Sequence, residues 1–411
     1  MAGDDTNGDD RPGSWFTPGV GGIGAASLLA DVGHEIPTSL LPGLLTTTLG
    51  APASALGLIE GIADGIAGGA RLAGGALADD PARRRAVAVG GYVGTAVCSG
   101  LIGTAQAPWQ VGALRTGAWA LRGLRVPSRN ALLADLVPAA AYGRAYGFER
   151  AMDNLGAILG PLLAILLVGW VGVRGAILWS ILPGIAAAGA ILFAIRRAPR
   201  AERRRHEPVR LRVREALSGG LRPVMAGIGA FEVGNVAATL LILRATELLD
   251  PGRSHTRATQ LALGLYLVYN LTATLASVPA GRHGDRRGAT RTLLAGALAF
   301  LAAYAGFAAG PASVAGLVPW FVLAGVGIAA METAEAAAVA TLAPEAARGS
   351  AFGVLAGVQS LGNLAASGVA GILWSLWSAR VAFAYLAAWM LLAAVAFAWA
   401  PTQAAVADGS P

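Results

Sequence analysis

The chain has 411 residues, of which 55% are apolar and 13% are charged. A soluble domain carries roughly 25% charged residues, so the composition excludes an ordinary water-soluble protein and favours one that lies in a lipid bilayer. The formal net charge is +7, and the single cysteine, Cys98, excludes a disulfide within the chain.

The first thirteen residues contain four aspartates and one arginine. A secretory signal peptide starts with basic residues and continues into a short apolar run, and this segment has neither. We therefore expect residues 1–18 to form an acidic tail in the cytosol.

Long apolar stretches recur along the rest of the chain. An α-helix of about 20 apolar residues is enough to cross the hydrocarbon core of a bilayer. The sequence therefore predicts an all-α membrane protein with twelve transmembrane helices. These predicted spans cover residues 19–47, 54–77, 86–105, 108–126, 141–168, 173–195, 223–249, 258–280, 290–309, 313–341, 350–376 and 380–400.

The two halves of the chain repeat one pattern at an offset of 206 residues. Gly75 and Asp79 precede a group of arginines, and Gly281 and Asp285 do the same. A repeat of this length defines the architecture, so we expect two pseudo-symmetric six-helix bundles. The same offset relates Pro138, Gly143, Ala145, Gly147, Leu155 and Gly156 to Pro344, Gly349, Ala351, Gly353, Leu361 and Gly362.

The repeat also predicts the domain boundaries. The two bundles are expected at residues 19–195 and 223–400, with a basic linker at 196–222 and a cytosolic tail at 401–411. Even-numbered connections between the predicted spans hold most of the arginines. Because basic connections stay in the cytoplasm, both chain ends are predicted to lie there. The odd-numbered connections hold only Arg174, Arg253, Arg257 and Arg380.

The arginine-rich linker is interpreted as a juxtamembrane segment that faces anionic lipid. A nucleic-acid partner is not expected, because the net positive charge is explained by the distribution of arginines among the connections. The protein is expected to act as a monomer in contact with membrane lipids.

The repeated motif resembles the cytosolic motif of the major facilitator superfamily (MFS). Each copy lies between the second and third predicted spans of its half, and the resemblance covers nearly the whole chain. The first copy departs from the usual motif at Asp80 and Ala82. The resemblance implies a transporter whose two bundles expose a central site alternately to each side of the membrane. The motif residues are Gly75, Asp79, Arg83 and Arg84 in the first copy, and Gly281, Asp285, Arg286, Gly288 and Arg291 in the second.

The resemblance further implies that these residues form a cytosolic gate. Asp79 is expected to face the N-terminus of the eleventh span near Gly349, where the helix dipole favours a negative charge. By the repeat, Asp285 is expected near Gly143. One motif arginine is expected to pair with a local acid, and the residues concerned are Arg83, Arg84 and Asp135.

A narrower resemblance to a bacterial efflux-permease branch covers about residues 28–161. That branch includes permeases associated with nickel resistance. The chain departs from it in the fourth span, where Ala118 and Trp119 replace a usual Asp-Arg pair, and it lacks the His-rich tail of some metal exporters. The resemblance is carried by residues 58–64, 123–135 and 143–156.

Ionisable residues at membrane depth are the main candidates for chemistry, since each costs about 2.5–3.5 kcal/mol at the centre of a span. Asp31, His34 and Glu35 are spaced to share one face of the first span. In the MFS fold the first, fourth, seventh and tenth spans line the central cavity. Arg115, in the fourth span, is therefore expected to face Asp31 and Glu35.

Glu60 and Asp64 form a similar pair in the second span. The functional interpretation of all these acids is uptake of protons or cations, and the alternative is a structural ion network. Beside two acids, His34 could relay a proton or ligate a divalent metal.

The fifth span carries two motifs. Glu149, Arg150 and Asp153 lie close together and are more typical of a structural or gating network than of a substrate site. The other motif resembles the Gly-x-x-x-Gly-Pro pattern of facilitator-type antiporters and implies export, although ordinary packing of small residues is the alternative. This second motif consists of Gly156, Gly160 and Pro161.

The acids of the first half do not recur in the second, since Asp31 corresponds to Ala237 and Glu60 to Tyr266. Polar and aromatic residues of the second half are instead predicted to line a cavity for an organic or cationic substrate. Packing is the alternative interpretation of the aromatic ones. The predicted residues are Glu232, Asn235, Tyr266, Tyr269, Asn270, Trp320, Glu332 and Glu335.

Other classes of protein are poorly supported. The sequence has no Gly-x-x-x-x-Gly-Lys loop for ATP and no Ser/His/Asp or Cys/His cluster, so neither an enzyme nor a cofactor is expected. The alternatives are a polytopic membrane enzyme, a lipid-handling protein and a protein that binds a ligand without transporting it.

The sequence therefore predicts a proton-coupled exporter in the inner membrane of a bacterium. Asp31 and Glu35 are the predicted coupling acids. A cationic or neutral substrate is expected because acids outnumber bases in the first-half cavity. A divalent metal held by Asp31, His34 and Glu35 is the alternative cargo. The cavity residues counted are Asp31, Glu35, Glu60 and Asp64 against Arg115.

Overall fold

The computed structural model describes residues 15–198 and 209–400, and every regular element among them is a helix. The predicted tails and the middle of the linker lie outside the described residues. The first half contains α1 (Pro18–Gly43), α2 (Ala53–Ala78), α3 (Pro81–Leu101), α4 (Pro108–Leu136), α5 (Tyr142–Trp179) and α6 (Ile181–Arg197). The second contains α8 (Leu221–Gly234), α9 (Ala238–Leu249), α10 (His255–Arg287), α11 (Ala289–Ala309), α12 (Val314–Leu342), α13 (Arg348–Leu376) and α14 (Ala379–Trp399).

Five short elements complete the chain. The linker contributes α7 (Val213–Ala216), and tight turns follow or precede the long helices. These turns are η1 (Leu44–Thr48), η2 (Ile102–Thr104), η3 (Ala139–Ala141) and η4 (Glu345–Ala347).

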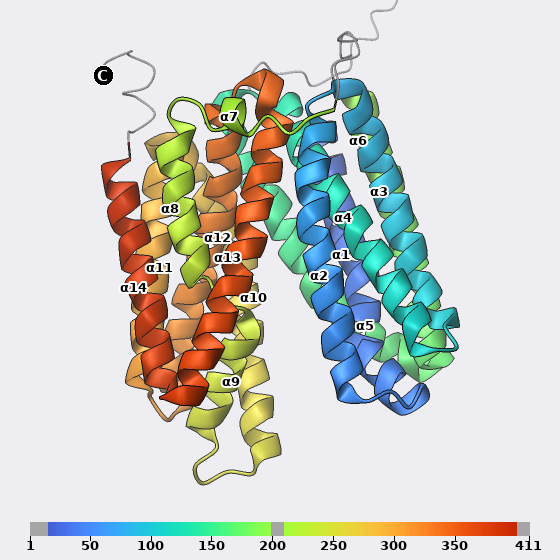
Figure 1. The fold of residues 1–411 in the computed structure, drawn as a ribbon, viewed down its shortest axis with the longest axis vertical. Helices are drawn as coiled ribbons and strands as arrows, with labels where there is room; N and C mark the ends of the chain where they lie inside the picture. Colours follow the sequence, from blue (N-terminus) through green and yellow to red (C-terminus); the bar gives the residue numbers. More distant parts are fainter. Residues whose placement is uncertain (1–14, 199–208, 401–411) are drawn as a thin grey trace, which may run out of the picture.

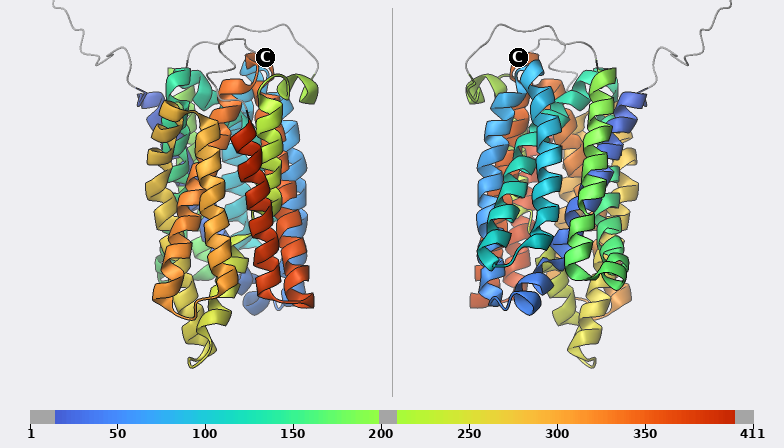
Figure 2. Two further views of the ribbon diagram at one scale, coloured as in Figure 1. Left: turned by 90° about the vertical axis from the view of Figure 1, so that its left-hand side faces the viewer. Right: turned by 90° about the vertical axis from the view of Figure 1, so that its right-hand side faces the viewer.

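The long helices form two bundles that stand side by side, with α1 to α6 in one and α8 to α14 in the other (Figure 1). Two further views show the helices running nearly parallel, with α7 at one end (Figure 2). Between the bundles, α2 packs on α13 and α5 packs on α10 and α12. The predicted fold of twelve transmembrane helices in two pseudo-symmetric bundles is confirmed, with α8 and α9 together forming one span.

Eight stretches of the described residues are long and apolar enough to cross a membrane. They include α3, α5 with α6, α8 with α9, and each helix from α10 to α14. Ionisable residues lower the mean hydropathy of α1, α2 and α4, which fall outside this set. The helices with the weakest hydropathic signal are therefore those that carry the candidates Asp31, His34, Glu35, Glu60, Asp64 and Arg115.

The seventh span is broken, whereas the sequence predicts one continuous helix. Between α8 and α9, residues 235–237 leave the helical conformation. Side chains that are distant in the sequence satisfy the freed backbone groups, as a membrane interior requires. The bonds run from Val236 N to Tyr304 Oη (3.3 Å), from Ala237 N to Ser367 Oγ (3.0 Å) and from Asn363 Nδ2 to Asn235 O (2.9 Å).

One other boundary differs from the prediction, whereas the boundary between the fifth and sixth spans agrees with the predicted start at residue 173. The helix α4 continues to Leu136, ten residues past the predicted end, because residues 127–136 pack inside the bundle instead of forming a loop. Gly172 has a φ of 71° and breaks α5, so the residues after it belong with the sixth span.

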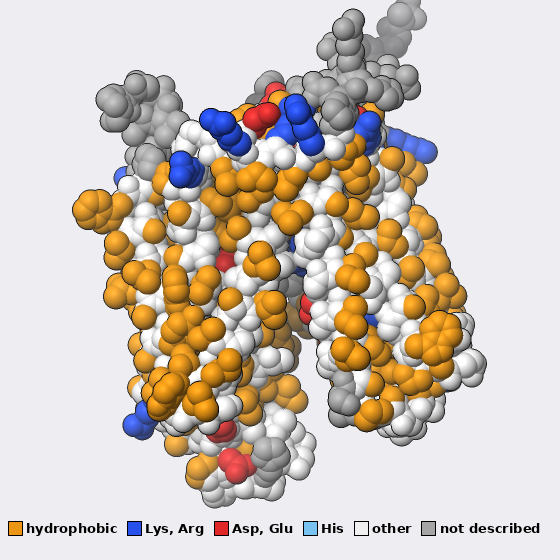
Figure 3. Space-filling view, in the orientation of Figure 1, with side chains coloured by type: hydrophobic (Ala, Val, Ile, Leu, Met, Phe, Trp, Pro, Cys, Tyr) orange, Lys and Arg blue, Asp and Glu red, His pale blue; other side chains and the backbone are white. Residues whose placement is uncertain are grey.

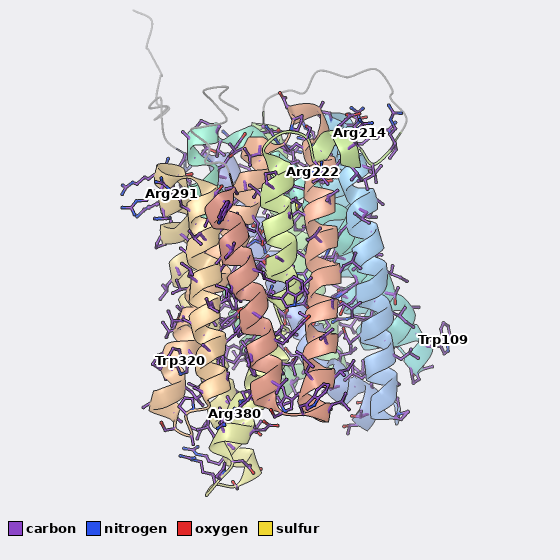
Figure 4. All side chains as sticks on the ribbon, turned by 60° about the vertical axis from the view of Figure 1, so that its left-hand side comes forward. Trp109, Arg214, Arg222, Arg291, Trp320 and Arg380 are labelled. Atoms are coloured by element: carbon purple, nitrogen blue, oxygen red, sulfur yellow. The ribbon has the colours of Figure 1, made fainter. Side chains whose placement is uncertain are left out.

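The bundles are closed against each other at one end and separate at the other. Figure 3 shows a cleft between them that opens away from the linker, with acidic and basic side chains in its depth. Arg214, Arg222 and Arg291 lie at the closed end, while Arg380 lies at the open end (Figure 4).

Candidate functional site

The first copy of the repeated motif joins the two halves at the closed end. Asp79 follows the last residue of α2 and accepts hydrogen bonds from Ser350 N (2.8 Å) and Ser350 Oγ (2.5 Å), in the first turn of α13. Gly75 lies directly on Gly353, and a Cβ at Gly75 would be 2.7 Å from the Gly353 Cα. Asp79 therefore lies where the sequence predicts it, at the N-terminus of the eleventh span.

The charge of Asp79 depends on those two donors. Burial raises the pKa of the Asp79 carboxyl, and the hydrogen bonds from Ser350 oppose that rise. Nearby, Arg84 forms the predicted ion pair with Asp135, and Arg348 Nη1 also lies 3.8 Å from Asp135. Arg83 contacts Asp80 instead, at 3.3 Å.

The second copy makes an equivalent junction on the other side of the pseudo-symmetry axis. Asp285 accepts hydrogen bonds from Gly143 N (2.7 Å), Arg144 N (3.1 Å) and Arg144 Nε (2.6 Å) at the start of α5. Gly143 and Gly281 touch through their backbones, so a side chain at either position would force the halves apart. Two motif arginines, Arg286 and Arg291, are exposed and take no part in this junction.

The three candidates of the first span form a row along α1. His34 Nδ1 lies 3.2 Å from Asp31 Oδ1 and 3.1 Å from Ala30 O, while His34 Nε2 lies 3.2 Å from Glu35 Oε1. Each ring nitrogen therefore faces an acceptor. The two carboxylates meet opposite nitrogens and do not converge on one point. No metal-binding cluster of His, Cys, Asp and Glu occurs in the described chain, so the predicted metal chelate is not formed.

Arg115 does not face Asp31 and Glu35, contrary to the prediction. It donates to Glu60 Oε2 (3.0 Å) and Thr38 Oγ1 (2.9 Å), and its guanidinium stacks on the Trp119 ring at 3.4 Å. The partner of Asp31 is Arg122, whose Nη2 lies 3.4 Å from Asp31 Oδ1. The difference follows from side-chain reach, since Arg122 is about two helical turns beyond Arg115 on α4.

Asp64 has a neutral partner. Trp119 Nε1 donates to Asp64 Oδ1 at 2.8 Å, and the same Trp119 ring lies edge-on to His34. Trp119, where the chain departs from the resembled efflux-permease pattern, thus supplies Asp64 with a neutral hydrogen-bond donor. It also joins the candidates of α1 and α2 into one connected group.

The acids of the fifth span belong to a dense network that includes a residue the sequence analysis left out. Arg129 Nη1 lies 2.7 Å from Glu149 Oε1 and 3.6 Å from Asp153 Oδ1, and Arg150 Nη1 lies 3.3 Å from Asp153 Oδ2. Asp153 is also within hydrogen-bond reach of Asp31. Arg129 was placed in a connection by the predicted end of the fourth span.

The glycines of the span-5 motif position the acids of α1. A Cβ at Gly156 would be 2.7 Å from the Asp31 Cβ, and one at Gly160 would be 2.5 Å from the Glu35 Cβ. Without these glycines α1 could not approach α5 at the level of its two acids. Pro161 follows within the same helix, where it removes one backbone donor.

The second half buries two carboxyl groups on neighbouring helices. Glu232 on α8 and Glu335 on α12 are 4% and 1% exposed, and the two helices pack on each other. Their partners are amides: Asn235 Nδ2 donates to Glu232 (3.1 Å) and Gln359 Nε2 donates to Glu335 (2.7 Å). Neither carboxyl has a basic side chain within ion-pair distance among the described residues.

The remaining candidates of the second half divide into two groups. Tyr266 and Tyr269 stack at a centroid distance of 5.7 Å, and Asn270 donates to Tyr266 O, all on α10. Glu332 lies 3.9 Å from Arg150 of the first half, which makes it a contact between bundles. Trp320 of α12 packs over Gly306 of α11, is partly buried, and lies at the edge of its own bundle (Figure 4).

The predicted excess of acids in the first-half cavity counts Arg115 as the base, and the structure places further arginines beside the same group of acids. These arginines are Arg122, Arg129 and Arg150. The second half, in contrast, has Glu232, Glu332 and Glu335 with no arginine of their own bundle within ion-pair distance in the described chain.

Two six-helix bundles that meet at a charged midplane and close at one end define a membrane transporter of the alternating-access type. The family model of the Major Facilitator Superfamily matches residues 23–249 and 232–410. The chain belongs to the major facilitator superfamily, and it is a multi-pass membrane transport protein and not an enzyme.

The individual relatives do not identify the transported substrate. An uncharacterized protein of Mycobacterium tuberculosis is 34% identical over 182 residues, which is 44% of this chain and 44% of that protein. The matched segment thus spans less than half the length of that relative. An uncharacterized MFS-type transporter of Methanocaldococcus jannaschii is 26% identical and covers 88% of this chain and 90% of its own.

Among solved structures, a bacterial homologue of the iron transporter ferroportin in an outward-facing state aligns with a TM-score of 0.72. The alignment covers 92% of this chain and 98% of that one, at 16% identity. At this identity the likeness shows the fold alone.

Proposed function

We propose that the protein is a proton-coupled exporter of a cationic or neutral small molecule in the cytoplasmic membrane of a bacterium. Its ends face the cytosol, and the cleft between the bundles opens outward. The two bundles rock about the midplane, so that release of the Asp79 and Asp285 junctions opens the cytosolic side.

The burial of Glu232 and Glu335 without a basic partner within ion-pair distance in the described chain carries the proposal. An ionised carboxylate that is buried without a counter-charge is strongly unfavourable, so protonation of these groups is favoured. Two like charges in a medium of low dielectric also repel strongly. A buried pair of this kind binds a proton readily and releases it when its surroundings change.

Asp31 and Asp153 form a second pair of acids, but they lie among cations. Arg122 and Arg150 lie within 3.4 Å of one or the other, which stabilises the ionised forms. We therefore assign the transported proton to the pair in the second half, and a supporting role to Asp31 and Glu35.

The second-half wall also supports the choice of cargo. Glu332 is partly exposed toward the cleft, and the Tyr266–Tyr269 pair offers aromatic faces, which suit an organic cation. Export is supported by the likeness of Gly156, Gly160 and Pro161 to the antiporter motif. A divalent metal is disfavoured because no set of ligands converges.

Infrared difference spectroscopy tests the proton site without knowledge of the cargo. Purified protein exchanged between H2O and D2O should show the carbonyl stretch of a protonated carboxyl, and Glu335→Gln should remove it. Glu247→Gln, at an exposed ion pair with Arg244, is the matched control and should retain the band. A band that persists in both Glu232→Gln and Glu335→Gln would place the proton elsewhere.

Transport itself is tested in proteoliposomes with an imposed pH gradient and tetraphenylphosphonium as the organic cation. Proton movement coupled to the cation is expected for the unmodified protein and for Glu247→Gln. Coupling that survives in Glu335→Gln would contradict the assignment, whereas coupling to an organic anion would contradict the proposed cargo.

A further inference from the structure

One buried arginine of the first half has no acidic partner. Arg122, Arg125 and Arg129 lie on one face of α4, at spacings of three and four residues. Arg122 pairs with Asp31 and Arg129 pairs with Glu149. Arg125 is 3% exposed, yet no carboxylate lies within 4.0 Å of it in the described chain.

The contacts of Arg125 leave its charge uncompensated. Its guanidinium lies over the Tyr92 ring, 3.8 Å from the centroid, and its Nε has no hydrogen-bond partner among the described residues. An aromatic face attracts a cation but does not neutralise it. A buried charge without a counter-charge is strongly unfavourable, so a structure that retains one needs something to pair with it.

A small cavity lies next to this arginine, between α1, α3, α4 and α6. Tyr92 Oη and Ser99 Oγ belong to residues that line it, and both are buried without a hydrogen-bond partner in the described chain. Gly33 and Gly184 form another wall, where α1 and α6 touch closely. Three unsatisfied polar groups thus belong to one cavity.

The cavity suits an anion better than any other guest. The volume of the cavity is about 10 Å³, which is roughly the minimum for one small guest. The two hydroxyls and the guanidinium can all donate, and no carboxylate is among the lining residues. A water molecule could satisfy the hydroxyls but would leave the positive charge of Arg125 unpaired.

We propose that Arg125, Tyr92 and Ser99 hold a small monovalent anion of the chloride type inside the first bundle. His34 also lines the cavity, but its ring nitrogens face Asp31, Ala30 and Glu35. The site lies within one bundle, away from the cleft between bundles. The anion is therefore a bound component that fixes α1 against α3, α4 and α6, and not the cargo.

Thermal unfolding of the purified protein in detergent tests this site. Chloride is titrated against gluconate at constant ionic strength, because gluconate is too large to enter. The Tm should rise with chloride, and bromide should replace chloride. Ser99→Ala should raise the chloride concentration for half of the effect roughly fivefold, as expected for the loss of one hydrogen bond of about 1 kcal/mol.

Arg125→Gln should abolish the chloride dependence, while Arg380→Gln, at an exposed arginine, should leave it unchanged. Anomalous diffraction from a bromide-containing crystal of the unmodified protein provides a test that no unstable variant can obscure, with a peak expected between Arg125 and Ser99. Equal Tm values in chloride and gluconate, or a chloride effect retained in Arg125→Gln, would overturn the proposal. Absence of the bromide peak would also overturn the proposal and would indicate that the cavity holds water.

Discussion

The two halves of the chain place different chemistry at equivalent positions. At the offset of 206 residues, Arg129 corresponds to Glu335 and Asp153 corresponds to Gln359. In the first half, Arg129 lies 2.7 Å from Glu149 and 3.6 Å from Asp153. In the second, Glu335 meets the amide of Gln359.

The comparison separates charges that are fixed from charges that can change. An acid held between arginines stays ionised, because losing the charge would leave the arginine unpaired. An acid held by amides can gain or lose a proton without leaving a cation behind. A duplicated fold can therefore keep one half as a rigid ionic support while the other half titrates.

The largest expected effect comes from breaking the ionic support. Arg129→Gln leaves Glu149 and Asp153 with Arg150 in place of two shared cations, and it should lower the free energy of unfolding by about 3–5 kcal/mol. The measurement is chemical unfolding in detergent. The double variant Arg129→Gln, Glu149→Gln should recover part of the loss. A loss of unfolding free energy no larger than the loss caused by Glu335→Gln would contradict the comparison between the halves. The reason is that Glu232 and Glu335 can be neutralised without leaving an unpaired charge.

The cytosolic junctions should give intermediate effects of unequal size. Asp285 accepts three hydrogen bonds and Asp79 accepts two. At about 1 kcal/mol per bond, Asp285→Asn should shift the balance toward the inward-open form more than Asp79→Asn. Spin labels at the two cytosolic ends, in a background that lacks Cys98, would measure the populations. Equal shifts would show that the motif copies are energetically equivalent.

The smallest effect is expected at the bridge between bundles. Arg150 Nη1 and Glu332 Oε2 are 3.9 Å apart, so their direct coupling should be below about 1 kcal/mol. A double-mutant cycle with Arg150→Gln and Glu332→Gln measures it. A coupling of several kcal/mol would show that the ionic network of the first half and the acids of the second half act as one network. The distinction between the halves would then not hold.

The residues predicted correctly are those whose neighbours are local or fixed by the repeat. Asp79 and Asp285 could be placed because the motif recurs at one offset, and the Asp31–His34–Glu35 row could be placed because helical spacing determines it. Partners on other helices could not be predicted for Asp31 and Arg115, which lie outside the repeated motif. Arginine is long, and the rotation of α4 relative to α1 decides whether Arg115 or Arg122 reaches Asp31.

Two further errors share a physical cause. The predicted fourth span ends at residue 126, yet Pro127 is accommodated within α4 and Arg129 pairs with Glu149 inside the bundle. The break at residues 235–237 was missed because the donors that stabilise it, Tyr304 and Ser367, are far away in the sequence. A hydropathy scale includes the free-energy cost of placing a polar group in the membrane, but it does not include the partner that lowers this cost.

The junctions at the closed end have a consequence for how freely the two halves can diverge. Asp79 and Asp285 each accept hydrogen bonds from main-chain N–H groups at the start of a helix. Every residue except proline provides that donor, so most substitutions at Ser350 or Arg144 preserve it, provided that the helices can still approach, whereas Gly143 leaves no room for a side chain. Because the donors at this gate are main-chain N–H groups, the residues on the donor side other than Gly143 can be substituted while the aspartates on the acceptor side cannot. The interior of each bundle could therefore acquire its own charges while the mechanism of opening stayed common to both.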